Sequence, residues 1–291
     1  MEIWIPITIA AAFLQNLRSM LQKRATGTLS VNGATYIRFY YAVPFVWIYL
    51  LALGIDQDVP RVSPEFLMHC LLGGLGQIAA TAFLIASFTH DNFAVGTTFS
   101  KSEVALTALV GFVILGDTLA GSQWLGIAVS FCGVALMSLR GAFTDLFRGN
   151  RALLLGMLAG AGFAIAAVNY RAAALSLADG DFLIRAGLTL AVSVTLQTII
   201  MGAYLLAREP GELTRVRQNW RSALWVGLLG AAASAAWFSA MTLMNAGLVR
   251  ALGQVELLFT FLTSIWFFKE VVSRRQIAGA VLVVVGIWVL L

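Results

Sequence analysis

The sequence repeats itself at one fixed offset across its two halves. Glu103 lies 153 residues before Glu256, and the same offset relates Asp117 to Glu270. Further pairs at this offset join identical residues: Asn16 with Asn169, Arg18 with Arg171, Gly74 with Gly227, Asn92 with Asn245, Gln123 with Gln276, Gly126 with Gly279 and Gly133 with Gly286. One offset that relates so many pairs indicates an internal repeat, which constrains every later statement about the fold.

The composition is that of a chain that folds in lipid. Of the 291 residues, 60% are hydrophobic and only 11% are charged, whereas a soluble domain has about 25% charged residues. The 27 glycines fit this class, because small residues allow transmembrane helices to approach closely. The net charge of +5 does not indicate nucleic-acid binding, since the basic residues lie in short loops between apolar runs.

Ten stretches are long and apolar enough to cross a bilayer, which takes about 20 residues in a helix. They are residues 3–22, 32–53, 66–88, 94–115, 122–140, 151–173, 181–206, 221–243, 247–268 and 274–291. Five fall in a first repeat, residues 1–145, and five in a second repeat, residues 146–291. Because five is odd, the second repeat enters the bilayer from the opposite side. We predict an all-α integral membrane protein with ten transmembrane helices in a 5+5 inverted-topology repeat, a ground plan of secondary transporters.

Basic residues in and beside loops predict the orientation. One side collects Lys23, Arg24, Arg140, Arg148, Arg151, Arg208, Arg215, Arg217, Arg221, Lys269, Arg274 and Arg275. The other side collects Arg61, Arg171, Arg185 and Arg250. The first side is therefore expected to be cytoplasmic, with both termini outside. We expect a multi-pass protein of a bacterial inner (plasma) membrane.

The chain resembles the EamA family of the drug/metabolite transporter superfamily over nearly its whole length. The resemblance rests on Arg38-Phe39, Gly116-Asp117, Lys269-Glu270, Glu256 and the glycine pairs Gly126/Gly133 and Gly279/Gly286. It implies ten helices around a central cavity and the movement of small metabolites by alternating access. The chain departs from the family pattern at Val104 and Leu257, where proline is common. We therefore expect straighter helices at these two positions.

The four glycines at positions 126, 133, 279 and 286 recur at a seven-residue spacing, close to two helical turns. We predict that they form a small-residue packing seam in the spans 122–140 and 274–291.

Glu103 and Glu256 are the main candidates for chemistry. Each lies about eight residues inside its predicted span, or about 12 Å deep at 1.5 Å per residue. Ionised carboxylates at that depth are costly, rarely face lipid and are functional by default. We expect them to bind protons or substrate. The alternative is a structural role, in which each carboxylate is hydrogen-bonded to a neighbouring helix.

Lys101 and Gln254 occupy equivalent positions in the two repeats. On a regular helix Lys101 points about 200° away from Glu103, so the two are poor partners. Lys101 can bind a substrate carboxylate or phosphate, or neutralise a glutamate on another helix. The repeats are thus chemically unequal here, as the binding of an asymmetric solute requires.

Six further residues are weaker candidates for substrate or proton binding. They are Asn16, Asn169, Arg18, Arg171, Gln77 and Trp237. Asparagines inside transmembrane helices also serve as interhelical hydrogen-bonding groups. Arginines near helix ends also extend to the membrane interface. The glutamine and the tryptophan are expected to form cavity walls, with plain packing as the alternative for the tryptophan.

We expect a secondary active transporter, an exporter of small polar or amphipathic metabolites such as amino acids, coupled to protons through intramembrane glutamate. No Gly-x-x-x-x-Gly-Lys-Ser/Thr motif for ATP is present. The alternative is a lipid-moving or non-transporting membrane protein of the same fold. An enzyme is not expected, because His69 and His90 lack metal-ligand spacing. The expected partners are a small-molecule substrate, protons and membrane lipid, with no cofactor, no nucleic acid, and a monomer or homodimer.

Overall fold

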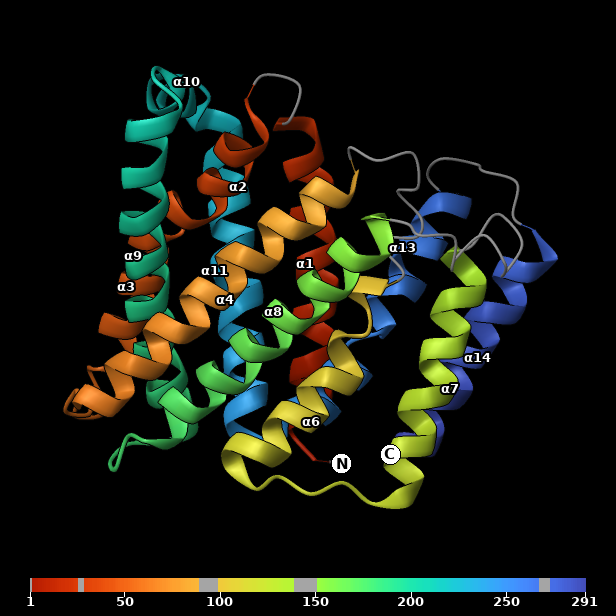
Figure 1. The fold of residues 1–291 in the computed structure, drawn as a ribbon. Coiled ribbons are helices and arrows are strands. Elements are labelled where there is room, and N and C mark those ends of the chain that lie inside the picture. Colours follow the sequence, from red (N-terminus) through yellow and green to blue (C-terminus); the bar gives the residue numbers. More distant parts are fainter. Residues whose placement is uncertain (1, 26–28, 89–98, 139–150, 267–272) are drawn as a thin grey trace. The chain divides into compact units, whose positions relative to one another are not determined.

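A computed structural model describes residues 2–25, 29–88, 99–138, 151–266 and 273–291. All secondary structure in these ranges is helical (Figure 1). The helices are α1 (Trp4–Ala25), α2 (Val31–Tyr40), α3 (Val43–Leu53), α4 (Pro64–Phe88), α6 (Glu103–Leu115), α7 (Gly121–Ser138), α8 (Arg151–Leu175), α9 (Phe182–Arg208), α10 (Glu212–Gln218), α11 (Trp220–Leu243), α12 (Ala246–Leu252), α13 (Val255–Trp266) and α14 (Arg274–Leu290).

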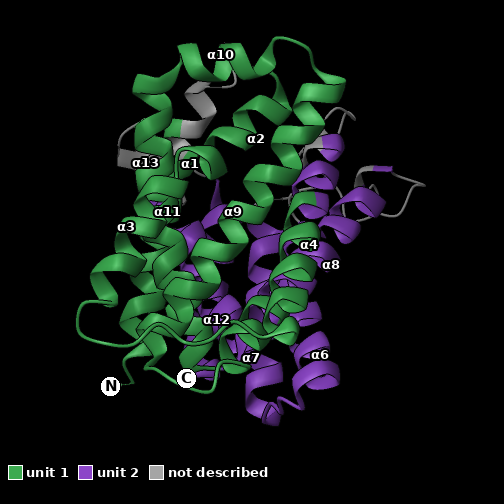
Figure 2. Ribbon diagram, turned by 90° about the vertical axis from the view of Figure 1, so that its left-hand side faces the viewer, with its two compact units in different colours: residues 1–78, 169–244 green, residues 79–168, 245–291 purple. Residues whose placement is uncertain are grey.

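The chain forms two compact units, each built from both halves of the sequence (Figure 2). Unit 1 contains residues 1–78 and 169–244, and unit 2 contains residues 79–168 and 245–291. In unit 1, α11 packs against α1, α2, α3 and α9. In unit 2, α7 packs along α14, and α12 packs against α6.

Five described segments are long and apolar enough to cross a membrane. They are Val31–Leu53, Pro64–Leu84, Leu153–Leu175, Phe182–Arg208 and Trp220–Leu243. Two shorter apolar helices, Glu103–Leu115 and Gly121–Met137, overlap two more of the predicted spans, 94–115 and 122–140. The count of ten spans therefore remains a prediction.

The predicted span 32–53 is two helices rather than one. α2 ends at Tyr40 and α3 begins at Val43, with Pro44 in its first turn. Proline has no N–H to donate to the carbonyl four residues earlier, here Tyr40, and its ring crowds that carbonyl. The break follows from this one residue.

Two further breaks contradict the expectation of straight helices around Val104 and Leu257. The chain turns at Lys101–Ser102 before α6 and at Gly253–Gln254 between α12 and α13. The first turn uses tight i→i−3 bonds, and the Ser102 hydroxyl donates to the carbonyl of Phe99 at 2.6 Å, in competition with regular helix bonding.

The second turn has the same tight pattern. The backbone N–H of Gln254 donates to the carbonyl of Ala251 at 3.1 Å, and that of Glu256 donates to Gly253 at 3.0 Å. Glycine has low helix propensity, which helps the helix end here without proline. The straight-helix expectation was wrong because it considered proline alone.

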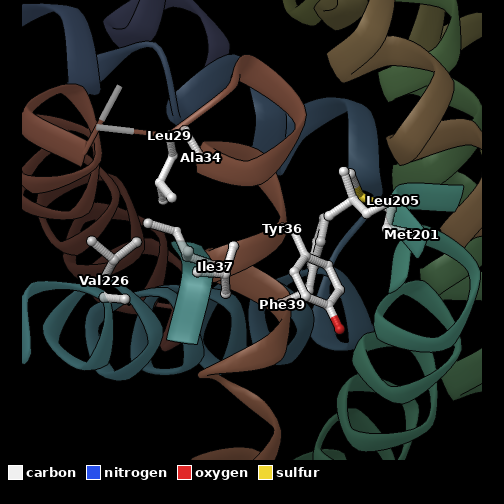
Figure 3. Packing of buried hydrophobic residues seen from close by; sticks show 10 residues of the cluster. Leu29, Ala34, Tyr36, Ile37, Phe39, Met201, Leu205 and Val226 are labelled. Atoms are coloured by element: carbon white, nitrogen blue, oxygen red, sulfur yellow. The ribbon is translucent and has the colours of Figure 1, made fainter. Parts of the chain in front are cut away.

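An apolar cluster surrounds α2 in unit 1. Figure 3 shows Tyr36 and Phe39 beside Leu205 and Met201 of α9, and Ile37 toward Val226 of α11. Lipid tails are as apolar as these side chains, so burial from water cannot favour the contact inside a bilayer. Close van der Waals packing is the stabilising term instead.

The predicted small-residue seam is confirmed in unit 2, where α7 and α14 lie side by side (Figure 1). A Cβ added to Gly126 would lie 2.7 Å from the carbonyl oxygen of Gly286, and one added to Gly133 would lie 2.7 Å from that of Gly279. The order of these contacts makes the two helices antiparallel. α7 and α14 are repeat-equivalent, and an inverted repeat requires this antiparallel course.

Candidate functional site

An ion pair inside unit 2 joins two of its helices. Arg250 Nη1 of α12 lies 3.2 Å from Glu103 Oε1, and the two side chains are only 17% and 13% exposed. Glu103 is the first residue of α6, directly after the turn at Lys101–Ser102. A carboxylate in a first turn also interacts favourably with the helix dipole. Arg250 and the start of α6 thus both lie beside the Glu103 carboxylate.

The structure changes the setting of both glutamates. Each was expected about eight residues inside a continuous helix, but Glu103 and Glu256 lie in the first turns of α6 and α13. The α8 backbone passes close to the first break, since a Cβ on Gly160 would lie 3.0 Å from the backbone nitrogen of Glu103. Both repeats thus place a carboxylate at the start of a helix that begins within a predicted span.

Lys101 and Gln254 lie in the two turns themselves. The 200° separation of Lys101 from Glu103 assumed a regular helix and does not apply, because Lys101 is not in one. Gln254 is only 6% exposed, and its Oε1 has no hydrogen-bond partner among the described residues. The Gln254 side chain is therefore a buried acceptor at a break in a helix.

Unit 1 contains a neutral hydrogen-bond network around Gln77. Gln77 Oε1 accepts from Gln197 Nε2 at 2.6 Å and from the Tyr170 hydroxyl at 2.9 Å. Gln197 Nε2 also donates to the Tyr170 oxygen at 3.1 Å. The three side chains join α4, α8 and α9 within this unit.

A small hollow in unit 1 lies beside this network. Its wall consists of Arg38, Phe39, Ala42, Gln77, Leu190, Val194, Gln197, Gly230, Ser234 and Phe238. The hollow has room for roughly one water molecule. Its one charged wall residue is Arg38, so the hollow favours an anionic or hydrogen-bond-accepting group. Gln77 thus lines a cavity wall, and its role toward a substrate remains a prediction.

Asn169 and Arg171 on α8 make helix-to-helix contacts. Asn169 Oδ1 lies 2.8 Å from His69 Nδ1 on α4. Arg171 Nη1 donates to the backbone carbonyls of Met241 at 2.6 Å and Met244 at 2.7 Å. These carbonyls close α11 at its C-terminal end, where intrahelical donors are missing. Arg171 therefore caps a helix.

The equivalent residues of the first repeat, Asn16 and Arg18, are both buried on α1. Arg18 packs close to Gly230, one of the residues that line the hollow. A Cβ added to Gly230 would lie 3.5 Å from the Arg18 Cδ. Trp237 of α11 is not in that wall, and its Nε1 donates to Gln15 Oε1 of α1 at 3.0 Å. Trp237 thus takes part in packing α11 on α1.

A carboxylate pair at the end of α9 holds the start of α2, a feature the sequence did not indicate. Glu209 accepts hydrogen bonds from the Ser30 hydroxyl and from Asn32 Nδ2, each at 2.6 Å. Glu212 is buried and accepts from the Ser30 backbone N–H at 2.6 Å. Arg215 lies 3.2 Å from Glu212. This contact fixes the beginning of α2 within unit 1.

The predicted site did not include several residues that contact its members, among them Arg250, Tyr170, Gln197 and His69. None of them has an identical residue at the 153-residue offset. Arg250 was counted among the basic residues in or beside loops, and it lies within α12. No group of three or more metal-ligating side chains occurs among the described residues.

These observations define an integral membrane protein with apolar spanning helices, breaks beside carboxylates and an antiparallel pair of repeat-equivalent helices. The sequence model of the EamA-like transporter family matches residues 2–139 and 150–291. The chain belongs to the EamA-like transporter family, whose members are membrane transporters of the drug/metabolite type.

A solved structure titled "Crystal structure of protein" is similar to this chain with a TM-score of 0.77. The alignment covers 99% of this chain and 96% of that one, at 16% sequence identity. At this identity the likeness concerns the fold alone. No curated protein matches the sequence.

Proposed function

We propose that this protein is a secondary active transporter that exports small polar or amphipathic metabolites, such as amino acids, by alternating access with proton coupling. The observation that carries the proposal is the placement of Glu103 and Glu256 at the starts of α6 and α13, next to helix breaks. Carboxylates inside spanning segments are costly and mark ion or substrate pathways. Interrupted helices at such positions are typical of transporter binding sites.

Glu103 is already part of an ion pair in unit 2. The charge of Glu103 is offset by Arg250 at 3.2 Å, so this carboxylate has an internal counterion. Neutralising Glu103 would also leave Arg250 without its counterion, so the test of proton coupling begins with Glu256. In a second step, a substrate that carries charges of its own can separate the Glu103–Arg250 ion pair.

A cationic donor and a neutral acceptor support an amphoteric substrate. In unit 2 the turn before α6 contains Lys101, a donor, and the equivalent turn before α13 contains Gln254 with a buried acceptor. A molecule with both a carboxylate and an amine can satisfy such a set. An amino acid is the simplest molecule of this kind.

The test is transport into proteoliposomes with an imposed pH gradient. We expect Glu256→Gln to abolish proton-driven accumulation of the substrate while leaving substrate exchange without a gradient intact, because the amide retains polarity but cannot carry the proton. Glu65→Gln is the matched control, since Glu65 is exposed at the start of α4. The control should accumulate substrate as the wild type does.

Unchanged proton-driven accumulation in Glu256→Gln would contradict the assigned role. Vesicles that neither accumulate nor exchange any amino acid, yet redistribute labelled lipid between leaflets, would favour the lipid-moving alternative. The same preparation therefore tests both functions.

A further inference from the structure

The side-chain oxygen of Gln254 is a buried hydrogen-bond acceptor with no donor in the described ranges of the chain. The residue is 6% exposed, and Oε1 has no partner among the described parts of the chain. Buried polar atoms are almost always hydrogen-bonded, so each exception requires an explanation. A donor that arrives with a ligand is one such explanation.

Both backbone groups of Gln254 have hydrogen-bond partners in the turn. Its N–H donates to the carbonyl of Ala251 at 3.1 Å, and its own carbonyl accepts from Leu257 N–H at 2.9 Å. The turn between α12 and α13 is therefore complete without the side chain. The side-chain oxygen takes no part in the hydrogen bonds that the described residues form at this turn.

We propose that Gln254 Oε1 accepts a hydrogen bond from an N–H group of the transported molecule, specifically the ammonium group of an amino acid or another primary amine. An ammonium group brings three donors and no acceptor, which suits a bare carbonyl oxygen. Glu256, two residues further on in the first turn of α13, places a carboxylate in the same stretch. This inference rests on the proposed transport function and names the group by which the substrate is recognised.

Gln254→Met tests the proposal, since methionine has nearly the same length and no amide. Removing an unsatisfied buried oxygen should leave the melting temperature of the ligand-free protein unchanged or higher. The twenty common amino acids are then each compared with their desamino counterpart acids in thermal-shift and flux assays. In the wild type, amino acids that bind should be preferred to the desamino acids.

In Gln254→Met the apparent affinity for those amino acids should fall about ten-fold or more, because a hydrogen bond to a charged donor is lost. The weak response to the desamino acids should not change. Gln218→Met, at an exposed position of α10, is the matched control and should behave as the wild type. This pattern would support recognition of the ammonium group.

Three results would overturn the proposal. They are a large fall in the melting temperature of ligand-free Gln254→Met, an unchanged preference for amino over desamino acids in that variant, and no amino acid that stabilises the wild type. A Gln254-dependent stabilisation by sodium chloride, absent with choline chloride, would make the occupant a metal cation and would also overturn it. Gln254-dependent amine binding without any flux would leave the inference standing and remove the transport function.

Discussion

Two of the polar contacts between helices, one in each compact unit, are of different kinds. Unit 1 uses neutral partners around Gln77, with Gln197 and Tyr170 at 2.6 and 2.9 Å. Unit 2 uses opposite charges, with Glu103 and Arg250 at 3.2 Å, at the start of a helix that follows a break. A neutral network holds helices together without any change of charge. A proton or a charged solute can rearrange an ion pair beside a break, so under the proposed function we expect coupling to depend on the ion pair more than on the amide network.

Arg250→Leu should have the largest effect on this comparison. It leaves the Glu103 carboxylate in a largely buried position without its counterion, which costs about 3–5 kcal/mol. The measurement is denaturant or thermal unfolding of the purified protein in detergent. The double variant Glu103→Gln/Arg250→Leu should regain most of the loss. A double variant as unstable as Arg250→Leu would show that packing of the arginine stem, and not the charge, holds α12 on α6.

Gln197→Leu tests the neutral side of the comparison. It removes the donor of two hydrogen bonds and leaves Gln77 Oε1 with fewer partners, at an expected cost of about 1–3 kcal/mol. Flux and its pH dependence should remain those of the wild type in protein that stays folded. Gln218→Leu, at an exposed position, is the control. Altered coupling in Gln197→Leu would mean that unit 1 also takes part in the transport step.

The composition, the repeat and the residue spacing in the sequence were enough to predict the helical class and the packing of α7 on α14. The glycine spacing of α7 and α14 predicted their seam, because a seven-residue recurrence keeps small residues on one helix face. The helical class followed from composition. These features depend on averages over many residues, so a single sequence is enough to find them.

The ion pair and the amide network could not be predicted in the same way. Arg250 and Glu103 lie on different helices. The repeat counterpart of Arg250, 153 residues earlier in the sequence, is Thr97 and not an arginine. Gln197 likewise has Pro44 as its repeat counterpart. Contacts between unlike residues of distant segments depend on how helices pack. Only the three-dimensional arrangement within each unit shows them.

Helix caps at the surface provide the smallest test of the contrast between charged and neutral partners. In unit 1, Asp181 caps α9 by accepting from the backbone N–H groups of Leu183 at 2.9 Å and Ile184 at 3.0 Å. The bond from Ile184 is the main reason that the pKa of Asp181 lies below its ordinary value of 3.8. In unit 2, Ser273 caps α14 with a neutral hydroxyl.

A lowered folded-state pKa means that the stabilisation by Asp181 is complete above pH 3.8 and is lost as the pH falls through the lowered value. Asp181→Asn should keep the cap, with stability at pH 7 within about 0.5 kcal/mol of the wild type, and should remove this acid-side loss. Ser273→Ala should instead cost about 1 kcal/mol at every pH. Unfolding curves from pH 7 down to pH 3 measure both. If the stability of the wild type and of Asp181→Asn falls equally between pH 7 and pH 3, the charge of this cap does not contribute to stability.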